Sequence, residues 1–450
     1  MTENKKILIV AYHFSPDAEV GALRPQKFAK YLPEFGWQPY VLTVKEKYIE
    51  KRDEGRLQDV LGIPITRTSF WRTPLKLFLD IRDKFRNKKL QHFTENRQPP
   101  TSVNGKYNKK ELLSARLKRY FVLFNWFPDE KLYWTIPAVI AGNRLIHKEK
   151  IKYIFATSPP HTVAIIGLIL SKLTGAKLVI DFRDPWVSCR QRMPETLRCR
   201  FYDELETKCE EKVIQRAHLV ISTTDRLCKA LRAYYPAIPS EKFATITNGY
   251  DKDDFKRINV RADNKDKYII SYIGTFYLER NPEIFLKALR KVITEGNIPT
   301  DKLEVRFIGV VNEVINKPIS LMLEEQSMTD FVTVKGQVPH SEALRQMHEA
   351  DLLLLFAPNF SYQIPAKTFE YIAARRPILV LAEDGATADL IREVNAGLVV
   401  NQEDFEEIYQ ALKQFYHHYL NSSDNWYKGS SLKEYDRKAL TRRLVDLLER

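Results

Sequence analysis

The stretch Ile364–Val380, IPAKTFEYIAARRPILV, predicts a short helix, a turn and a buried strand. Pro365 suits the first helical position, where its missing N–H costs nothing. Helical spacing separates two sets of residues: Phe369, Ile372 and Ala373 toward the core, and Lys367, Glu370, Tyr371 and Ala374 on the other side. A helix followed by an apolar strand is the repeating element of a parallel α/β sheet.

This alternation of short apolar strands with helices extends along the whole chain. KKILIVAYHF, PYVLTV, YIFATSPP, KLVIDFRDPW and HLVISTT alternate with helical segments, and the pattern restarts after the polar stretch RADNKDK with YIISYIGTF. Such a pattern predicts doubly wound parallel sheets. We expect two Rossmann-like domains, with boundaries at 1–245 and 246–428, and a charged C-terminal helix over 429–450 that packs back on the first domain.

Length and composition fit this organisation. The 450 residues exceed one ordinary core and favour two domains of about 200 residues. Four cysteines form no disulfide framework, so a reducing cytoplasm is expected. The N-terminal apolar run predicts a strand and not a signal peptide, and TVAIIGLIL is far shorter than the roughly 20 residues of a membrane span.

The positive charge of the chain is concentrated in one basic segment. The formal net charge is +14, and residues 66–122 contain 15 Lys and Arg against 4 Asp and Glu. Aromatic and aliphatic residues alternate with these charges within a helical excursion over about 66–135. Contact with an anionic membrane surface and a solvated helical face remain comparable alternatives, and nucleic acid is the weaker one.

Two loops of the first half carry candidate polar sites. Parallel sheets place ligands at the carboxyl ends of their strands, here in an expected cleft between the domains. Gly21 precedes a helix start and would let a ligand approach the backbone, unless it is a plain turn glycine. Asp181, Arg183 and Asp184 follow a buried strand, where they form either a polar pocket or a structural ion pair.

In the second half of the chain, the candidate residues are those expected of an anion-binding site. Gly274 lets the chain turn after a strand, and Arg280 lies just before a helix N-terminus, a combination that suits a diphosphate unless Arg280 is only a surface residue. Lys367 disfavours its own helix start slightly, which is explained if an anion lies above it. Glu370 could accept hydrogen bonds from a ribose diol, and the alternative is an ordinary surface pair of Lys367 with Glu370.

Six motifs, in order, resemble the retaining, metal-independent GT-B glycosyltransferases of family 4, in a bacterial branch that builds cell-surface polysaccharides. The motifs are AYHFSPDAEVGALRPQKF, FPDEKLYW with TSPPHT, DFRDPW, TITNGYDKDDF, IGTFYLERNP and PAKTFEYIAARRPIL. The resemblance implies the GT-B fold, with an acceptor in the N-terminal domain and a nucleoside-diphosphate sugar in the C-terminal domain. A lipid-linked or saccharide acceptor and a peripheral position at the cytoplasmic membrane face follow from it.

The resemblance also implies roles for particular residues. Arg280 and Lys367 would neutralise the diphosphate, and Asp184 joins them in the catalytic set. The expected donor-binding residues are Gly274, Thr275, Arg280, Gln363, Ile364, Lys367 and Glu370; the expected acceptor-binding residues are Gly21, His161, Asp181 and Arg183. Neither a metal nor another cofactor is expected beside the nucleotide sugar, and the diphosphate would itself act as base.

Several residues depart from the family pattern. Tyr362 stands where the family has the first of two glutamates, and Gln363 would replace its hydrogen bond to the sugar. Arg183 and Thr275 stand where a histidine and an arginine are common. Arg375 replaces a glycine, so we expect it in the left-handed conformation. A nucleotide-sugar 2-epimerase of the same fold and a catalytically silent scaffold remain the alternative functions.

Overall fold

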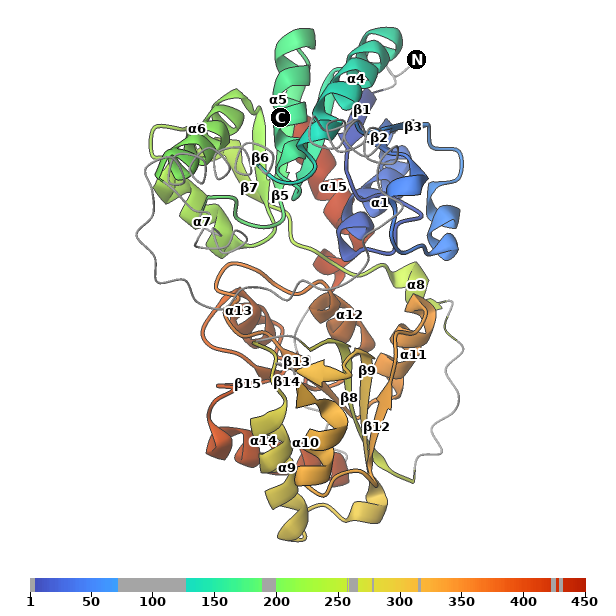
Figure 1. Cartoon of the computed structure of the whole chain (residues 1–450), viewed down its shortest axis with the longest axis vertical. Coiled ribbons are helices and arrows are strands. Elements are labelled where there is room, and N and C mark those ends of the chain that lie inside the picture. Colours follow the sequence, from blue (N-terminus) through green and yellow to red (C-terminus); the bar gives the residue numbers. More distant parts are fainter. Residues whose placement is uncertain are drawn as a thin grey trace, which may run out of the picture. The chain divides into compact units, whose positions relative to one another are not determined.

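The computed structural model describes residues 5–71, 127–187, 200–256, 258, 266–276, 279–314, 317–421, 426–428 and 432–450. Contacts divide the chain into two compact units, one of residues 1–25 and 36–220, the other of residues 26–35 and 221–450. Most of the basic segment, residues 72–126, lies outside the described residues. Figure 1 labels the elements of both units.

The first sheet has seven strands in the order β3-β2-β1-β4-β5-β6-β7. Ile7 of β1 lies beside Pro39 of β2 and Tyr153 of β4, both in parallel register. Residues 7–11 are fully buried, as expected for a parallel sheet that is covered on both faces. The strands are β1 (Lys5–Val10), β2 (Trp37–Val44), β3 (Ile65–Thr68), β4 (Tyr153–Ser158), β5 (Lys177–Phe182), β6 (Leu219–Ser222) and β7 (Phe243–Thr245).

Helices connect these strands, and side chains cap several of them. The Thr224 hydroxyl accepts a hydrogen bond from the Leu227 amide at the start of α7. The helical segments are α1 (Val20–Tyr31), η1 (Leu32–Phe35), η2 (Glu46–Tyr48), η3 (Glu54–Val60), η4 (Leu132–Trp134), α4 (Thr135–Glu149), α5 (Thr162–Thr174), α6 (Arg200–Arg216), α7 (Asp225–Tyr234), η7 (Ser240–Lys242) and α8 (Lys252–Lys256).

The second sheet has six strands in the order β12-β9-β8-β13-β14-β15, with every neighbouring pair parallel. They are β8 (Tyr268–Thr275), β9 (Leu303–Val310), β12 (Val332–Lys335), β13 (Leu352–Phe356), β14 (Ile378–Leu381) and β15 (Gly397–Val400). A separate antiparallel pair joins β10 (Glu313–Val314) to β11 (Lys317–Pro318).

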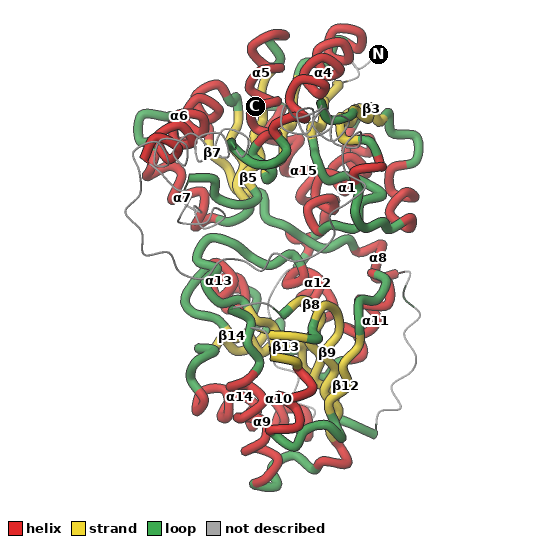
Figure 2. Tube along the Cα trace, viewed as in Figure 1, coloured by secondary structure: helices red, strands yellow, loops and turns green. Residues whose placement is uncertain are grey.

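Helices pack on both faces of the second sheet because its strand residues alternate between two cores. Tyr272 and Leu354 face a cluster with residues of α9, α10 and α14, whereas Ile273 and Leu355 face one with residues of α11, α12 and α13. Figure 2 shows these helices in red beside the yellow strands. The helical segments are α9 (Glu283–Thr294), η8 (Thr300–Lys302), α10 (Ile319–Glu325), α11 (His340–Glu349), α12 (Lys367–Ala374), α13 (Ala386–Glu393), α14 (Phe405–Leu420), η9 (Lys433–Tyr435) and α15 (Arg437–Leu448).

The two parallel α/β sheets confirm the predicted fold class. Two predictions about α12, its first residue and its buried face, were wrong. The helix begins at Lys367, two residues after Pro365. Tyr371 and Ala374 are buried, whereas Ala373 is only partly buried, because α12 packs against the sheet along a wider face than the periodicity indicated. Arg375 has φ of 53° at the end of α12, which confirms the predicted left-handed residue.

Among the described helices, none has both the length and the apolar character that crossing a bilayer requires.

Candidate functional site

Two glycines lie side by side near the carboxyl ends of β8 and β9. Gly274 of β8 lies in register with Gly309 of β9. Gly309 has φ of 123°, which a residue with a side chain rarely adopts, and a Cβ there would collide with the Gly274 carbonyl. A Cβ on Gly274 would collide with the Lys367 ammonium. The two glycines therefore keep this edge of the sheet open to the first residue of α12.

Lys367 holds its ammonium against the end of β8. Its Nζ donates a hydrogen bond to the Ile273 carbonyl at 2.9 Å and lies 4.0 Å from the centroid of the Tyr272 ring. Burial lowers the pKa of Lys367 well below its ordinary value, and the positive charge of Arg280 lowers it further. Glu370 acts in the opposite direction. An anion bound here would restore the charge of the ammonium.

Arg280 lies between β8 and α9, at the position where the sequence predicted a guanidinium. Its guanidinium carbon is 5.4 Å from the centroid of the Phe360 ring, so an aromatic face supports it. Its charge acts on Lys367, which places two cations within one electrostatic environment. Thr275, the last residue of β8, accepts a hydrogen bond from the Tyr272 hydroxyl through its carbonyl at 2.8 Å.

Glu370 is joined to a histidine that the sequence did not single out. The distance from His340 Nε2 to Glu370 Oε1 is 2.8 Å, and both side chains are largely buried. His340 is the first residue of α11, and Glu370 lies in the first turn of α12. The neighbouring helix starts thus fix the direction of the carboxylate that was predicted to hold the ribose.

The loop before α12 presents Tyr362, Gln363 and Ile364. Tyr362 is exposed, and its carbonyl accepts a hydrogen bond from the Thr224 hydroxyl at 2.6 Å. The Gln363 carbonyl accepts one from the Thr387 hydroxyl at 3.3 Å. Ile364 packs on the core beneath α12. Backbone hydrogen bonds therefore hold the loop in place, and its direct contact with a donor remains a prediction.

Asp181 forms a buried ion pair in the first unit. Arg24 donates from Nε and from its terminal nitrogen to the Asp181 carboxylate at 2.8 to 3.2 Å. The Thr157 hydroxyl donates to the same carboxylate at 2.7 Å. These contacts are those of the structural ion pair that the sequence left open as an alternative. They tie the start of α1 to the carboxyl ends of β4 and β5.

Arg183 and Gly21, both predicted to contact the acceptor, lie against each other. Arg183 donates to the Gly21 carbonyl at 2.7 Å and also to the Pro159 carbonyl. A Cβ on Gly21 would come within 2.6 Å of the guanidinium, so the glycine makes room for the arginine. Asp184 follows and is partly buried. Gly21 is the second residue of α1, whereas the sequence predicted that it precedes the helix. The guanidinium thereby connects the start of α1 to the loops after β4 and β5.

His161 lies in a rigid setting at the start of α5. Its ring stacks on Trp186 with centroids 4.8 Å apart, and its Nδ1 is 2.7 Å from the Ser158 hydroxyl. Asp129 caps the same helix by accepting hydrogen bonds from the Thr162 amide and hydroxyl. Burial raises the pKa of Asp129 despite these hydrogen bonds.

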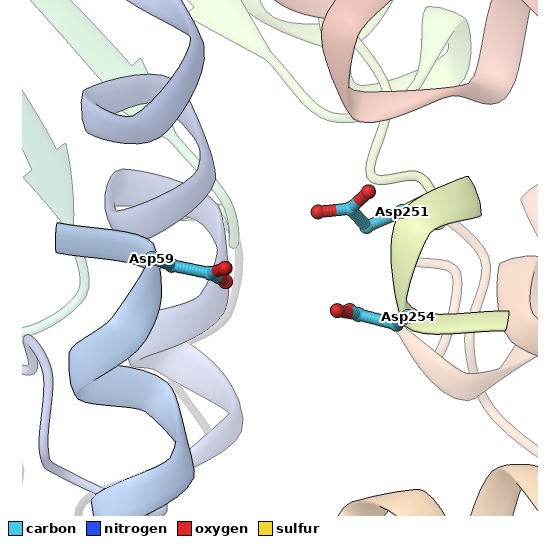
Figure 3. Close-up of side chains that lie close together, drawn as sticks. All are labelled: Asp59, Asp251 and Asp254. Atoms are coloured by element: carbon cyan, nitrogen blue, oxygen red, sulfur yellow. The ribbon is translucent and has the colours of Figure 1, made fainter. Parts of the chain in front are cut away.

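Two carboxylates, one directly before α8 and one within it, are paired with lysines. Asp251 accepts hydrogen bonds from Lys27 at 2.7 Å and from Lys30 at 2.8 Å, and Asp254 accepts one from Lys27 at 2.9 Å. Burial favours a raised pKa for Asp251, but the lysines lower it overall. Figure 3 labels these carboxylates together with Asp59, which belongs to the other unit. The lysine contacts give Asp251 and Asp254 a structural role.

Sequence reasoning missed His340 and Gly309. His340 stands in the motif PHSEALRQ, where a helix start after a proline is visible but its partner thirty positions away is not. Gly309 ends the apolar strand LEVRFIGV, and a glycine at a strand end is a signal for close backbone approach. The predicted donor residues lie in one unit, and the predicted acceptor residues lie in the other.

Two protein-family profiles match the sequence. Glycosyltransferase Family 4 matches residues 97–254, and Glycosyl transferases group 1 matches residues 267–418. No curated protein matches the chain.

Solved structures share the fold over the full chain. Anabaena HepE, in complex with UDP and glucose, has a TM-score of 0.64 and 13% identity, with 99% of both chains covered. A glycosyltransferase from Rickettsia africae ESF-5 has a TM-score of 0.62 and 13% identity, over 99% of this chain and 98% of that one. Sucrose-phosphate synthase from Thermosynechococcus elongatus has 0.61 and 15%, with the same coverage. Identities this low establish the shared fold alone.

Proposed function

We propose that this chain, a glycosyltransferase of the GT-B type by its two matched domains and its fold, transfers a sugar from a nucleoside-diphosphate sugar to a saccharide or lipid-linked acceptor. The observation that carries the proposal is the pair of cations at the carboxyl end of β8. Lys367 and Arg280 act on one another there, beside an edge of the sheet that Gly274 leaves open. Structures with the same fold contain UDP or UDP-glucose, which makes uridine nucleotides the first donors to test.

The cations supply the chemistry that the reaction needs on the donor side. Breaking the bond between the sugar and the diphosphate leaves negative charge on the departing phosphate oxygens. Lys367 and Arg280 stabilise that charge in a partly buried site, where electrostatic attraction is stronger than in water. Glu370, oriented by His340, accepts hydrogen bonds from the ribose. In this proposal Gly274, Thr275, Gln363 and Ile364 surround the remaining donor atoms.

The acceptor side of the proposal rests on the first unit. Arg183 connects the start of α1, at Gly21, to the loop that carries Pro159, and Asp184 and His161 lie on loops of the same unit. Retention of the anomeric configuration, independence from metals and a place in cell-surface polysaccharide synthesis follow from the family resemblance and belong to the proposal. Analysing the anomer of the product by NMR would test retention, and adding EDTA would test the independence from metals.

Binding of nucleoside diphosphates tests the donor site directly. UDP, GDP and ADP are titrated into the protein by calorimetry, and one of them is expected to bind. Lys367→Ala and Arg280→Ala should each weaken that binding by about 1.5–3 kcal/mol, the range for hydrogen bonds to charged groups. Lys302→Ala and Arg290→Ala, cations of the same unit outside the site, should leave it unchanged.

Two results would contradict the proposal in different ways. Unchanged affinity in both site variants would remove the site assignment while leaving the function open. If the unmodified protein binds none of the three nucleotides, the proposed function as a nucleotide-sugar transferase is wrong.

A further inference from the structure

A pocket of the second unit lies between α7, β7 and the end of α15. Its volume is about 340 Å³, at the lower end of the range for sites that bind small molecules. All of its lining residues belong to the second unit, and none of them is among the residues expected to bind the donor or the acceptor. The pocket is therefore separate from the proposed donor site.

Each of the two helices turns one side toward the pocket. On α7 the lining residues run from Asp225 to Arg232 at the spacing i, i+3, i+4 and i+7, which is a single side of a helix. The end of α15 contributes its lining residues at the same spacing, from Arg443 to Arg450 just beyond the helix. The pocket thus lies between two rows of side chains, and β7 forms its third wall.

Positive charge predominates in this pocket. Four cations and two carboxylates line it, so two positive charges remain unbalanced. Within the described part of the chain, the side chains of Lys229, Arg443 and Arg450 form no hydrogen bond or ion pair. The two carboxylates, Asp225 and Asp446, likewise form no ion pair with any described cation. The three cations are therefore available to an anion.

The wall formed by β7 adds a hydrogen-bond donor. Thr245 is 7% exposed, and among the described residues its hydroxyl has no hydrogen-bond partner. A hydroxyl in the wall of a pocket can donate to an oxygen of a bound ligand. Arg232 donates to the Phe243 carbonyl at 2.8 Å, which ties α7 to β7 beside this hydroxyl. The wall is thus held in place without a ligand.

The charges and the shape of the pocket indicate the class of ligand. Guanidinium groups bind phosphate oxygens through paired hydrogen bonds, and a lysine adds a point charge. A phosphomonoester carries a charge of about −1.5 to −2 at neutral pH, which balances the two excess positive charges. Because these groups line a concave pocket, a small soluble molecule fits them better than the headgroup of a lipid in a bilayer.

We propose that this pocket binds the phosphate group of a small soluble phosphomonoester. Lys229, Arg443 and Arg450 pair with the phosphate oxygens, and the Thr245 hydroxyl donates a hydrogen bond to one of them. The inference goes beyond the proposed glycosyl transfer and does not depend on it, since no residue of the donor site takes part. A ligand in this position connects α7 to the end of α15, so it should raise the temperature at which the protein unfolds.

Calorimetry with inorganic phosphate and with ribose 5-phosphate tests the site. Both probes are titrated into the full-length protein at low ionic strength, where charged contacts are least screened. Arg443→Gln combined with Arg450→Gln should weaken binding at least about tenfold, the loss expected of one hydrogen bond to a charged group. Lys229→Gln, on the opposite helix, should weaken binding as well.

A matched control separates the pocket from the net charge. Lys302→Gln combined with Lys335→Gln removes two exposed cations elsewhere in the same unit and should leave the affinity unchanged. The replaced pocket residues are also exposed, so their variants should fold, and their unfolding temperature without phosphate should equal that of the unmodified protein. An affinity for both probes that survives the pocket substitutions would overturn the site, and so would a failure of the unmodified protein to bind either probe.

The donor site could also attract phosphate, so Lys367→Ala combined with Arg280→Ala is titrated in parallel. This variant should still bind ribose 5-phosphate, whereas the pocket variants should still bind the nucleoside diphosphate. If ribose 5-phosphate binding is lost only in the donor-site variant, the pocket assignment is wrong. If the unmodified protein binds ribose 5-phosphate but none of the nucleotides, the proposed function fails and the pocket assignment stands.

Vesicles that contain phosphatidic acid, a lipid phosphomonoester, test the source of the phosphate. Sedimentation of the protein with them should not depend on Arg443 and Arg450. If it does depend on these arginines while neither soluble probe binds, the pocket takes a lipid headgroup and the proposal of a soluble ligand is wrong.

Discussion

Lys367 illustrates how one side chain can be prepared for a ligand. Its ammonium lies against the Ile273 carbonyl and the Tyr272 ring, in surroundings that favour its neutral form. A diphosphate would bring negative charge to the same nitrogen and favour its charged form. The pKa of Lys367 should therefore rise when the nucleotide binds.

Proton uptake should accompany nucleotide binding. Between the lowered pKa of the free protein and the raised pKa of the complex, Lys367 is neutral before binding and charged after it. Because binding takes up a proton, affinity should fall as the pH rises through this interval. Calorimetry in two buffers of different ionisation heat measures the uptake. Lys367→Met should abolish it, and an absence of uptake by the unmodified protein at every pH below the ordinary pKa of lysine would contradict the prediction.

Individual residues were predictable where their chemistry conflicts with their surroundings. Lys367 at one helix start and Arg280 before another helix start led to the prediction of an anion site. In the structure the Lys367 ammonium lies against Gly274, and the charge of Arg280 acts on it. Partners distant in sequence were not predictable, because a histidine such as His340 has no local signal for the carboxylate that it meets. Tyr371 was predicted on the side of α12 that faces away from the core, but it is buried. Helical periodicity does not reveal how much of the helix surface the sheet covers.

At the scale of elements, a buried charge cluster joins the second half of α1 to the segment around α8. Lys27 contacts Asp251 and Asp254, Lys30 contacts Asp251, and the Tyr31 hydroxyl donates to Asp251 at 2.6 Å. The sequence predicted the α1 helix, LRPQKFAKYLPEFG, but could not show that one of its lysines is buried. An amphipathic pattern treats every lysine as exposed, and only the tertiary fold provides carboxylates deep enough to pair with one.

Removing Lys27 should destabilise the protein substantially. Lys27→Ala leaves a buried carboxylate without its main counter-ion, which should lower the free energy of unfolding by about 3–5 kcal/mol. Lys287→Ala, which removes a partly exposed i,i+4 pair with Glu283, should change it by less than about 0.5 kcal/mol. Urea denaturation of both variants measures the difference. Equal stabilities would show that the cluster contributes little.

Asp251 of this cluster should make the protein less stable in acid, whereas the pKa of Asp254, which burial raises, acts in the opposite direction. The folded pKa of Asp251 lies below its unfolded value, so its contribution is complete above the unfolded pKa and is lost as the pH falls below it.

At the scale of the whole molecule, the alternation of strands and helices was sufficient to predict two parallel sheets. The order of the strands within each sheet was not predicted, since periodicity shows which segments are strands and not which neighbours they choose. The net charge of +14, concentrated in residues 66–122, is a whole-chain property of a different kind. It supports a proposed peripheral position at an anionic membrane, although residues 72–126 lie outside the described residues.

Vesicle binding tests the membrane proposal. The protein should sediment with vesicles that contain phosphatidylglycerol and not with pure phosphatidylcholine vesicles, and salt should release it because screening weakens the attraction. Reversing five charges between residues 82 and 89 should release it as well. The same number of reversals among exposed cations of the second unit is the control. If the variant with reversed charges between residues 82 and 89 still sediments with the vesicles, the basic segment is a solvated face and not a membrane contact.

Gly309 has a consequence for how this sequence can vary. Because its neighbour across the strands, Gly274, forms the floor beneath Lys367, a side chain at 309 would push that floor upward from behind. In the proposed donor site, a side chain at position 309 should therefore weaken nucleotide binding without touching the nucleotide. The proposed donor site thus predicts that natural variants with a side chain at position 309 bind nucleoside diphosphates more weakly, although residue 309 itself never meets the ligand.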